Sequence, residues 1–133
     1  MEISEIPLGR RRSLAKGEEA SMLEKLAQDF DPVVIRNLLR NLHTKEMDVI
    51  RIASMRPVHE STLTEIHDCE RWSHSQRVRM ALAQNPYCPA EIAMQIVASL
   101  PLPELREVQK AAHLHSSTLE FIDKELQRRK GRA

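Results

Sequence analysis

Apolar side chains recur at three- and four-residue steps through most of this chain, and prolines stand where the pattern breaks off. Met22, Leu23, Leu26 and Phe30, for example, follow one another at the spacing that places them on one face of a helix. Proline cannot continue a helix but fits its first turn, so each break predicts a helix end or a helix start. With only three glycines, one Trp, one Tyr and two Phe, the chain also lacks the composition of a strand-rich fold. An all-α protein is predicted.

About seven or eight short helices are expected, and polar residues indicate where several of them begin. Asp31 and Thr44 are predicted to cap the second and third helices. Ser73 and Gln76 have the spacing of a capping box at the start of the fifth helix. Asn85 is expected to end that helix in the left-handed conformation, which asparagine tolerates.

A chain of 133 residues suits one domain. Residues 1–17 mix two glycines, a proline and three consecutive arginines without a sustained period, so a flexible basic N-terminal arm is expected there. Residues 18–130 are predicted to form a single helical-repeat domain, and residues 131–133 a tail. Each division rests on where the helical period begins and ends.

The sequence also resembles itself. Three segments align without gaps and reach a second apolar position fourteen residues on, with first and second positions at Ile35 and Val49, Val78 and Ile92, and Val108 and Ile122. Each segment therefore has the pattern of a helix, a short turn and a second helix. In this alignment Asn85 and Pro86 have no counterpart in the other two segments. Helical pairs repeated at this kind of interval bury their apolar faces by stacking on one another.

The stretch VRMALAQNPYCPAEI resembles the leucine-rich-repeat-variant and HEAT-like family of bacterial α-solenoids. In that family a VR-x-x-x-A-x-NP segment precedes a helix that begins with proline. The resemblance is best over residues 77–100, and residues 55–100 also resemble short bacterial proteins built from such repeats. It implies a HEAT-like (ARM-type) right-handed α-solenoid of stacked hairpins, and it implies no activity, since such scaffolds carry many functions.

The net charge of +1 conceals a division along the chain. Residues 18–123 contain 11 Lys and Arg against 16 Asp and Glu, a net charge of −5, whereas both ends are basic. A protein that grips a phosphate backbone needs a basic surface, so nucleic acid is disfavoured as the main ligand. The acidic body instead favours a partner with basic or amphipathic segments.

The sequence also indicates a cellular location and the redox state of the cysteines. No apolar run is long enough to cross a bilayer, and the first residues do not have the apolar core of a signal peptide, so a cytoplasmic location is expected. Cys69 and Cys88 are the only cysteines and are expected to be reduced and buried.

Two groups of residues raise the possibility of chemistry. His67, Cys69 and His74 are close in sequence, and His113 and His115 form an HxH, but zinc requires three or four convergent ligands at tight spacing. Histidines at helix ends explain both groups, so no metal site and no cofactor are expected. For nucleophilic catalysis the best candidate is Cys88, just before the sixth helix, whose N-terminus would favour a thiolate. No orienting third group accompanies it, and no catalytic residue is assigned.

Two conspicuous side chains have structural interpretations. Arg79 is expected to cover apolar surface with its stem and to pair with an acid of a neighbouring helix. Trp72 is expected to fill the joint between the fourth and fifth helices. Neither is assigned to a ligand.

The interpretation that best fits these features is a non-enzymatic adaptor that presents a helical-repeat surface to another protein or to a second copy of itself. One alternative is a HEAT-like nucleic-acid-binding protein that uses its basic termini, and a second is a Cys- or metal-dependent enzyme. The expected binding surface lies on the second helix of each pair, at Glu46, Asp48, Arg51, Glu91, Gln95 and Lys124.

Overall fold

A computed structural model describes residues 2–111 and 113–131. Within these residues the chain forms ten α-helices, one short 3-10 helix and no strand. The all-α prediction is confirmed, but the prediction of seven or eight helices is too low. The elements in chain order are η1 (Ile3–Glu5), α1 (Leu8–Leu14), α2 (Ala20–Leu26), α3 (Pro32–Arg40), α4 (Glu46–Ala53), α5 (Glu60–Asp68), α6 (Glu70–Ser73), α7 (Gln76–Gln84), α8 (Ala90–Ala98), α9 (Leu102–Gln109) and α10 (Ser116–Lys130).

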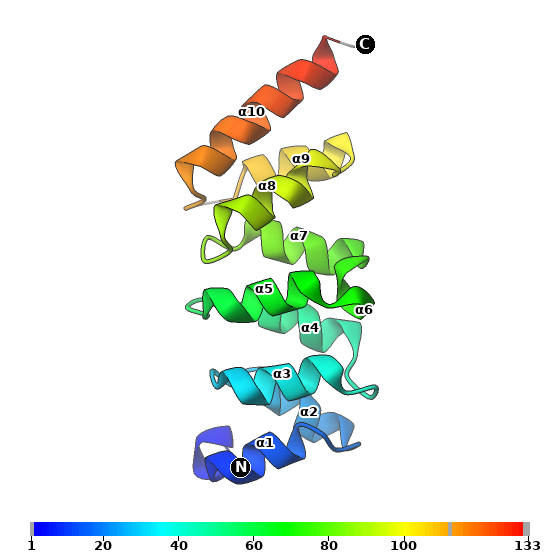
Figure 1. The fold of residues 1–133 in the computed structure, drawn as a ribbon, viewed down its shortest axis with the longest axis vertical. Helices are drawn as coiled ribbons and strands as arrows, with labels where there is room; N and C mark the ends of the chain where they lie inside the picture. The colour runs from blue at the N-terminus through cyan, green and yellow to red at the C-terminus, as the bar shows by residue number, and fades with distance from the viewer. Residues whose placement is uncertain (1, 112, 132–133) are drawn as a thin grey trace.

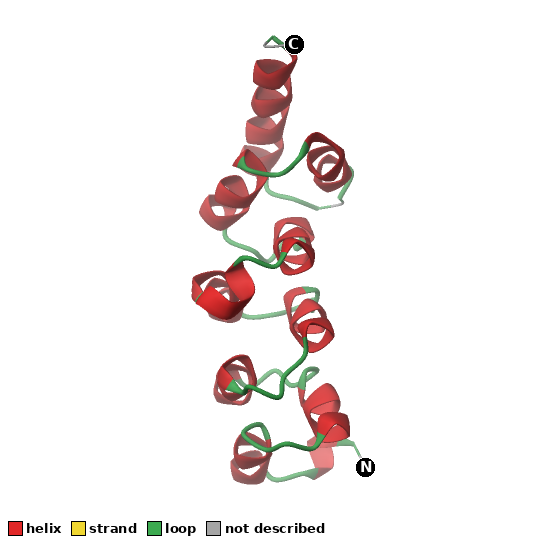
Figure 2. Cartoon of the chain, turned by 90° about the vertical axis from the view of Figure 1, so that its right-hand side faces the viewer, coloured by secondary structure: helices red, strands yellow, loops and turns green. Residues whose placement is uncertain are grey.

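The helices stack in two columns that run the length of the molecule (Figures 1 and 2). The first column consists of α1, α3, α5 and α8, and the second column consists of α2, α4, α7 and α9. The short helix α6 lies between α5 and α7, and α10 covers the C-terminal end of the stack against both α8 and α9. The two termini therefore lie at opposite ends of an elongated molecule.

The core is the continuous layer of aliphatic side chains between the columns. It contains fully buried residues from nearly every helix, among them Leu26, Leu38, Ile52, Ile66, Leu82, Ile96 and Leu105. Burying one such side chain stabilises a protein by roughly 1.5–3 kcal/mol. Val49, Ile92 and Ile122 are all buried, as the repeat pattern predicted.

Asparagine side chains join successive layers at the ends of helices. The Nδ2 of Asn85, the residue after α7, donates hydrogen bonds to the carbonyls of Ala53 and Met55, both at 2.9 Å, at the end of α4. Its Oδ1 accepts the backbone N–H of Tyr87 at 2.9 Å. The last carbonyls of a helix have no partner within the helix, so Asn85 satisfies buried groups of a neighbouring layer.

Asn41 does the same in the first column. It follows α3, and its Nδ2 donates to the carbonyls of Ala15 and Gly17 at 2.9 and 2.8 Å, at the end of α1. Its Oδ1 accepts the N–H of His43 at 2.8 Å. The expectation that Asn85 has no counterpart is therefore wrong. Asn85 is also not left-handed, since its φ and ψ are −89° and 118°.

The correspondence between Asn41 and Asn85 corrects the repeat alignment by one residue. Asp31 and Ser75 are N-caps that accept the N–H of Val34 and Val78, so the matching residues lie 44 apart, whereas the ungapped alignment separates them by 43. The two related segments, α3 with α4 and α7 with α8, nevertheless begin in different columns. The two segments thus share a local sequence pattern but not a position in the stack. The first helix of the pair lies in the first column in one copy and in the second column in the other.

Arginines supply the same kind of link elsewhere. Arg71 of α6 donates to the carbonyls of Asn41, Leu42 and Thr44 at 2.8, 3.2 and 3.0 Å, just beyond α3. Its guanidinium carbon also lies 4.3 Å from the ring centroid of Trp72. A side chain from one layer thus satisfies carbonyls of the layer before it.

Residues 1–17 do not match the expectation of a flexible arm. Residues 8–14 form α1, which packs against α3, and Ile6 and Ala15 are buried. Arg11 forms an ion pair with Asp29 at 2.8 Å, and Arg12 pairs with Asp31 at 3.1 Å. The arginine run lacks an apolar period, but two of its three charges are paired with acids of the next layer.

Two of the expected caps are displaced. Asp31 caps α3 as predicted, since its Oδ2 accepts the N–H of Val34 at 3.0 Å. Thr44 does not cap α4, because its hydroxyl donates to the carbonyl of Leu38 at 2.6 Å. Ser75 caps α7 in place of Ser73, with its Oγ accepting the N–H of Val78 at 3.3 Å. Ser73 instead belongs to the unpredicted helix α6.

Candidate functional site

The six residues predicted to form a binding surface do not share a face. Three of them lie on α4, in the second column, whereas the others lie on α8, in the first column, and on α10 at the end of the stack. Because the single helix α5 lies between the pairs α3–α4 and α7–α8, the second pair begins in the other column. The second helix of each pair therefore does not always fall in the same column. The residues are Glu46, Asp48 and Arg51 on α4, Glu91 and Gln95 on α8, and Lys124 on α10.

Asp48 and Arg51 have structural roles. Asp48 is buried, and its Oδ2 accepts the backbone N–H of Lys45 at 3.1 Å, which secures the start of α4. Arg51 lies between Glu24 and Asp48, with ion-pair distances of 3.3 and 3.6 Å. A side chain buried in a cap does not face a partner, so the prediction for Asp48 is wrong.

The remaining predicted residues are at the surface. Glu46 accepts a hydrogen bond from the hydroxyl of Ser75 at 3.1 Å and lies 3.4 Å from Arg77, which ties α4 to α7. Gln95 contacts the ring of His67 at 3.2 Å. Glu91 and Lys124 are exposed.

A groove runs across α4, α7 and α9 on the outside of the second column. We call it the column groove; it has a volume of about 390 Å³ and is lined by Ile50, Ser54, Gln76, Arg77, Met80, Ala81, Gln84, Glu104 and Glu107. Ile50, Met80 and Ala81 give it an apolar part, and each is only half-buried by the fold. Periodicity missed this surface because it is shared by three helices that are distant in sequence.

The column groove carries two acids from α9. Glu107 is exposed, whereas Oε2 of Glu104 is buried and has no hydrogen-bond partner among the described residues. The groove's one cation, Arg77, is already paired with Glu46. The two acids therefore leave negative charge beside the apolar part of the groove, which favours a ligand with basic and apolar residues.

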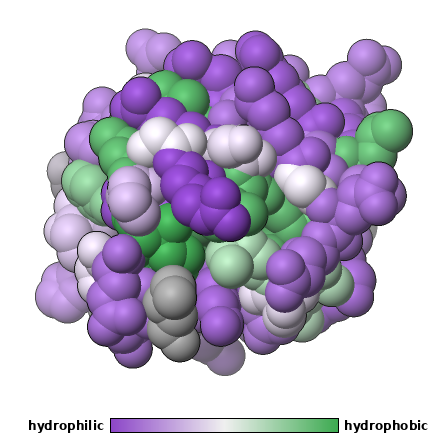
Figure 3. All heavy atoms as spheres, turned by 90° about the horizontal axis from the view of Figure 1, so that it is seen from below, coloured by the Kyte–Doolittle hydropathy of each residue, from purple (hydrophilic) through white to green (hydrophobic). Residues whose placement is uncertain are grey.

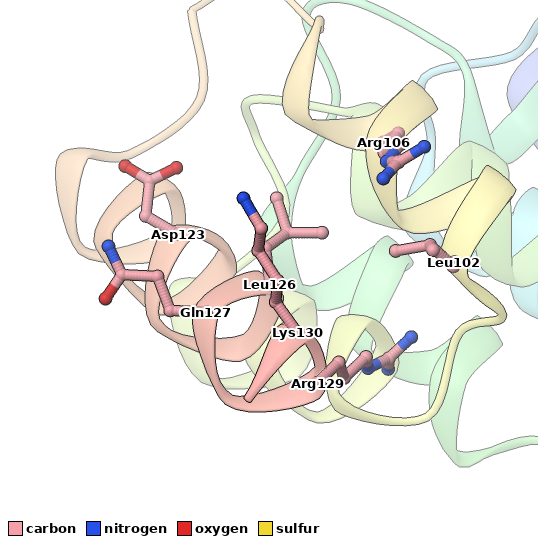
Figure 4. A pocket seen from close by; sticks show the side chains of 7 residues that line it. All are labelled: Leu102, Arg106, Asp123, Leu126, Gln127, Arg129 and Lys130. Atoms are coloured by element: carbon pink, nitrogen blue, oxygen red, sulfur yellow. The ribbon is translucent and has the colours of Figure 1, made fainter. Parts of the chain in front are cut away.

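A second concavity, the end pocket, lies between α9 and α10 (Figure 4). Its volume is about 560 Å³, and its lining residues are Leu102, Arg106, Asp123, Leu126, Gln127, Arg129 and Lys130. Figure 4 shows Leu102 of α9 and Leu126 of α10 pointing toward one another across the pocket. The pocket thus combines an apolar centre with charged residues around it.

Arg129 is fully engaged by the fold. It donates to the carbonyls of Leu100 at 2.6 Å and Ala98 at 3.3 Å, and it pairs with Glu125 at 2.9 Å. It thereby satisfies the end of α8, as Asn41 and Asn85 satisfy the ends of α1 and α4. Its charge is therefore committed to joining α10 to the stack.

Glu125 is expected to give the protein a stability that depends on pH in the acid range. Hydrogen bonds from Arg128 and then Arg129 lower the pKa of Glu125 from its ordinary value of 4.5 to about 2. A depressed carboxyl pKa stabilises the folded state above the unfolded value, and this contribution is lost as the pH falls from 4.5 toward 2. Glu125→Gln should lower the free energy of unfolding at neutral pH by about 2 kcal/mol.

Urea unfolding at a series of pH values measures this effect. The difference between the wild-type protein and the Glu125→Gln variant should shrink on acidification and vanish near the folded-state pKa. Glu120→Gln, at an exposed position of the same helix, is the matched control and should show little difference at any pH. A Glu125→Gln difference that stays constant with pH would contradict the assignment.

The structural interpretation of Trp72 agrees with the geometry, and that of Arg79 needs one change. Trp72 is buried on α6, between α5 and α7, and its indole N–H donates to the carbonyl of Leu39 at 3.2 Å. Arg79 does join α7 to the next helix, but it donates to the hydroxyl of Ser99 and to the carbonyl of Ile96, with no acid involved.

The cysteines and histidines do not come together as a reactive centre. Cys88 is buried, and this burial raises the pKa of its thiol to about 12, which opposes the thiolate expected near the start of α8. Among residues 2–111 and 113–131, no three His, Cys, Asp or Glu side chains are grouped so that they could hold a metal ion. His113 and His115 are both exposed, in the segment before α10.

The surface at the N-terminal end of the stack is mixed. Figure 3 shows hydrophobic groups near the middle of this end surrounded and partly covered by polar residues. Leu8 of α1 is 38% exposed here, while Arg11 and Arg12 are tied to acids of the next layer. Two cations of the basic N-terminal segment are therefore neutralised by the fold.

Comparisons with known proteins give no match. No protein-family model matches the chain, and neither a curated protein nor a solved structure resembles it closely enough to count as a match. Among the described residues, no helix has both the length and the apolar character needed to span a membrane. The surfaces themselves are thus the basis for assigning a function.

Proposed function

We propose that this protein is a HEAT-like α-solenoid that works as a non-enzymatic protein-protein interaction module, with the column groove as its binding surface. The two columns of stacked helices support this assignment, because stacked helical pairs form extended surfaces that other proteins recognise. The free thiols of Cys69 and Cys88 fit a reducing compartment, and we propose the cytoplasm as its location.

The observation that carries the proposal is the pair of acids from α9 beside an apolar surface in the column groove. Met80 and Ile50 offer apolar contact, and Glu104 and Glu107 offer negative charge. A segment with Lys or Arg next to apolar residues would bury its apolar side chains and place its positive charge beside the carboxylates of Glu104 and Glu107. The partner is therefore a protein segment that is basic and amphipathic, and charge-assisted hydrogen bonds between a cation and a carboxylate are among the stronger ones.

The nucleic-acid alternative is less well supported by the same contacts. Arg11 and Arg12 near one end and Arg128 and Arg129 near the other are all in ion pairs. The column groove contributes acids, which repel phosphate. The alternative of a Cys-dependent enzyme needs an accessible thiolate, and Cys88 is 1% exposed.

Selection from a library of random peptides displayed on phage tests the proposal. The enriched peptides should combine Lys or Arg with apolar residues, and raising the salt concentration should weaken their binding. Glu104→Lys replaces an acid of the groove by a cation, which repels the basic peptides. It should raise their Kd by at least about tenfold, equivalent to 1.4 kcal/mol.

Glu91→Lys is the matched control, because Glu91 is an exposed acid on the opposite column. It makes the same charge change and should leave the Kd within about twofold, as expected for a distant surface charge. Peptides without a basic residue, or equal losses in the two variants, would refute the column groove as the binding surface.

A further inference from the structure

The end pocket lies between α9 and α10 at one end of the described stack. α10 rests on α8 through one face, on which Thr118, Ile122 and Glu125 are buried. A second face of the same helix borders α9 and includes Leu126 and Lys130. Among the described residues α9 is the last member of the second column, so the end pocket lies where the next helix of that column would pack.

We propose that the end pocket is a docking site for an amphipathic helix of another protein, with an apolar stripe flanked by acidic residues. Such a helix would continue the second column beyond α9 and pack against α10, as α7 and α9 pack against each other. A helix recognises a groove of this kind through residues spaced three and four apart on one of its faces. This site is separate from the column groove, which favours a basic partner.

The apolar part of the proposal rests on two leucines. Leu102 is 38% exposed at the start of α9, and Leu126 is half-buried on α10. They face one another across a space of about 560 Å³ (Figure 4). That space lies in the size range of specific binding pockets and accommodates a few aliphatic side chains of a docked helix.

The charges around the pocket specify an acidic partner. Asp123 is already a hydrogen-bond acceptor of Gln109 at 2.8 Å, and Arg129 is committed to Glu125 and to backbone carbonyls. Arg106 and Lys130 also line the pocket, and neither forms an ion pair within the part of the chain that the structure describes. Glutamate or aspartate beside the apolar stripe of the docked helix would pair with them.

Two libraries of helical peptides provide the test. Both place leucines at positions i, i+3, i+4 and i+7; one has Glu at the flanking positions and the other has Lys there. Selection against the full chain should enrich the Glu library. The selected peptides, labelled and measured by fluorescence anisotropy, should lose at least about tenfold in affinity for the Arg106→Glu, Lys130→Glu double variant, a change of 1.4 kcal/mol or more.

Three further variants keep the test specific. Leu102→Asp, at a partly exposed position, should also weaken binding without unfolding the protein, which circular dichroism checks. Glu104→Lys should leave binding of these peptides unchanged, so the proposal for the end pocket is tested independently of the proposal for the column groove. Arg40→Glu, an exposed basic residue on α3, controls for net charge and should have little effect.

Three results would overturn the proposal of an acidic helical partner. Enrichment of the Lys library, or unchanged affinity of the Glu peptides for the Arg106→Glu, Lys130→Glu variant, overturns it. Analytical ultracentrifugation addresses a second copy of the chain as the occupant. A dimer that Leu102→Asp converts to a monomer would show that the pocket is a self-association site and would likewise overturn the proposal.

Discussion

Replacing Trp72 by alanine is expected to lower the free energy of unfolding by about 4 kcal/mol. The ring is 5% exposed, and it fills the space where α6 joins α5 to α7. Removing it leaves a cavity at this joint and also leaves the carbonyl of Leu39 without its indole donor. The guanidinium of Arg71, which lies over the ring, loses its contact as well.

Urea unfolding followed by far-ultraviolet circular dichroism measures this loss, since the variant lacks the only tryptophan. Trp72→Phe should lie between the wild-type protein and Trp72→Ala, because it keeps an aromatic ring but not the N–H. Tyr87→Ala is the control: Tyr87 is 42% exposed, and a surface truncation should cost about 0.5 kcal/mol. A Trp72→Ala loss no larger than that of Tyr87→Ala would show that Trp72 does not hold this joint together.

The second large effect is expected for Asn85→Asp. The substitution keeps the size of the side chain and the oxygen that accepts the N–H of Tyr87, but it replaces the amide donor by a carboxylate oxygen. That oxygen would face the carbonyls of Ala53 and Met55, which then lose their donor and meet a negative charge. We expect a loss of about 3 kcal/mol, the cost of unsatisfied buried polar groups.

Asn37→Asp is the matched control for this substitution. Asn37 is half-buried, and its amide donates a single hydrogen bond, to the carbonyl of Arg12 at 2.9 Å. Its loss should therefore be near 1 kcal/mol, about that of one hydrogen bond. Asn41→Asp should match Asn85→Asp, because Asn41 makes the equivalent contacts to Ala15 and Gly17. Equal losses for Asn37→Asp and Asn85→Asp would contradict the proposed link between layers.

The elements that the sequence predicted well are those whose signal is local. The Asp31-Pro32 pair identifies the start of α3, because a capping carboxylate and a proline at the first helical position act within one turn. Val49 and Ile122 are buried as expected, since the spacing of apolar residues decides which face of a helix turns inward. The prediction that Trp72 packs between helices is also confirmed, because a single large aromatic side chain in a mainly aliphatic sequence is usually part of the core.

The features that the sequence did not predict depend on partners far along the chain. Asn41 and Asn85 hold layers together, but an asparagine after a helix has the same local pattern whether its amide meets water or the carbonyls of another layer. Asp29 and Asp31 hold Arg11 and Arg12 of α1 against the next layer, and no period within residues 8–14 indicates these distant partners.

The residues around the proposed column groove were predicted only in part. Glu46, beside the column groove, was found because α4 has a clear apolar stripe that leaves Glu46 outside it. Glu91 and Lys124 were assigned to the same surface by equating α4, α8 and α10, and the intervening helix α5 places them elsewhere. Glu104 was not predicted, because its place in a groove shared with α4 and α7 is not revealed by periodicity within α9.

Photo-crosslinking in the native cell tests the central claim most directly. A photoreactive amino acid at Ala81, within the column groove, should form crosslinks to a distinct protein, and Glu104→Lys should abolish them. The same amino acid at Ser61, exposed on α5 in the other column, should give no such product. Crosslinks to nucleic acid from Ala81, crosslinks that survive Glu104→Lys, or equal products from Ala81 and Ser61 would contradict the assignment of the column groove as a protein-binding surface.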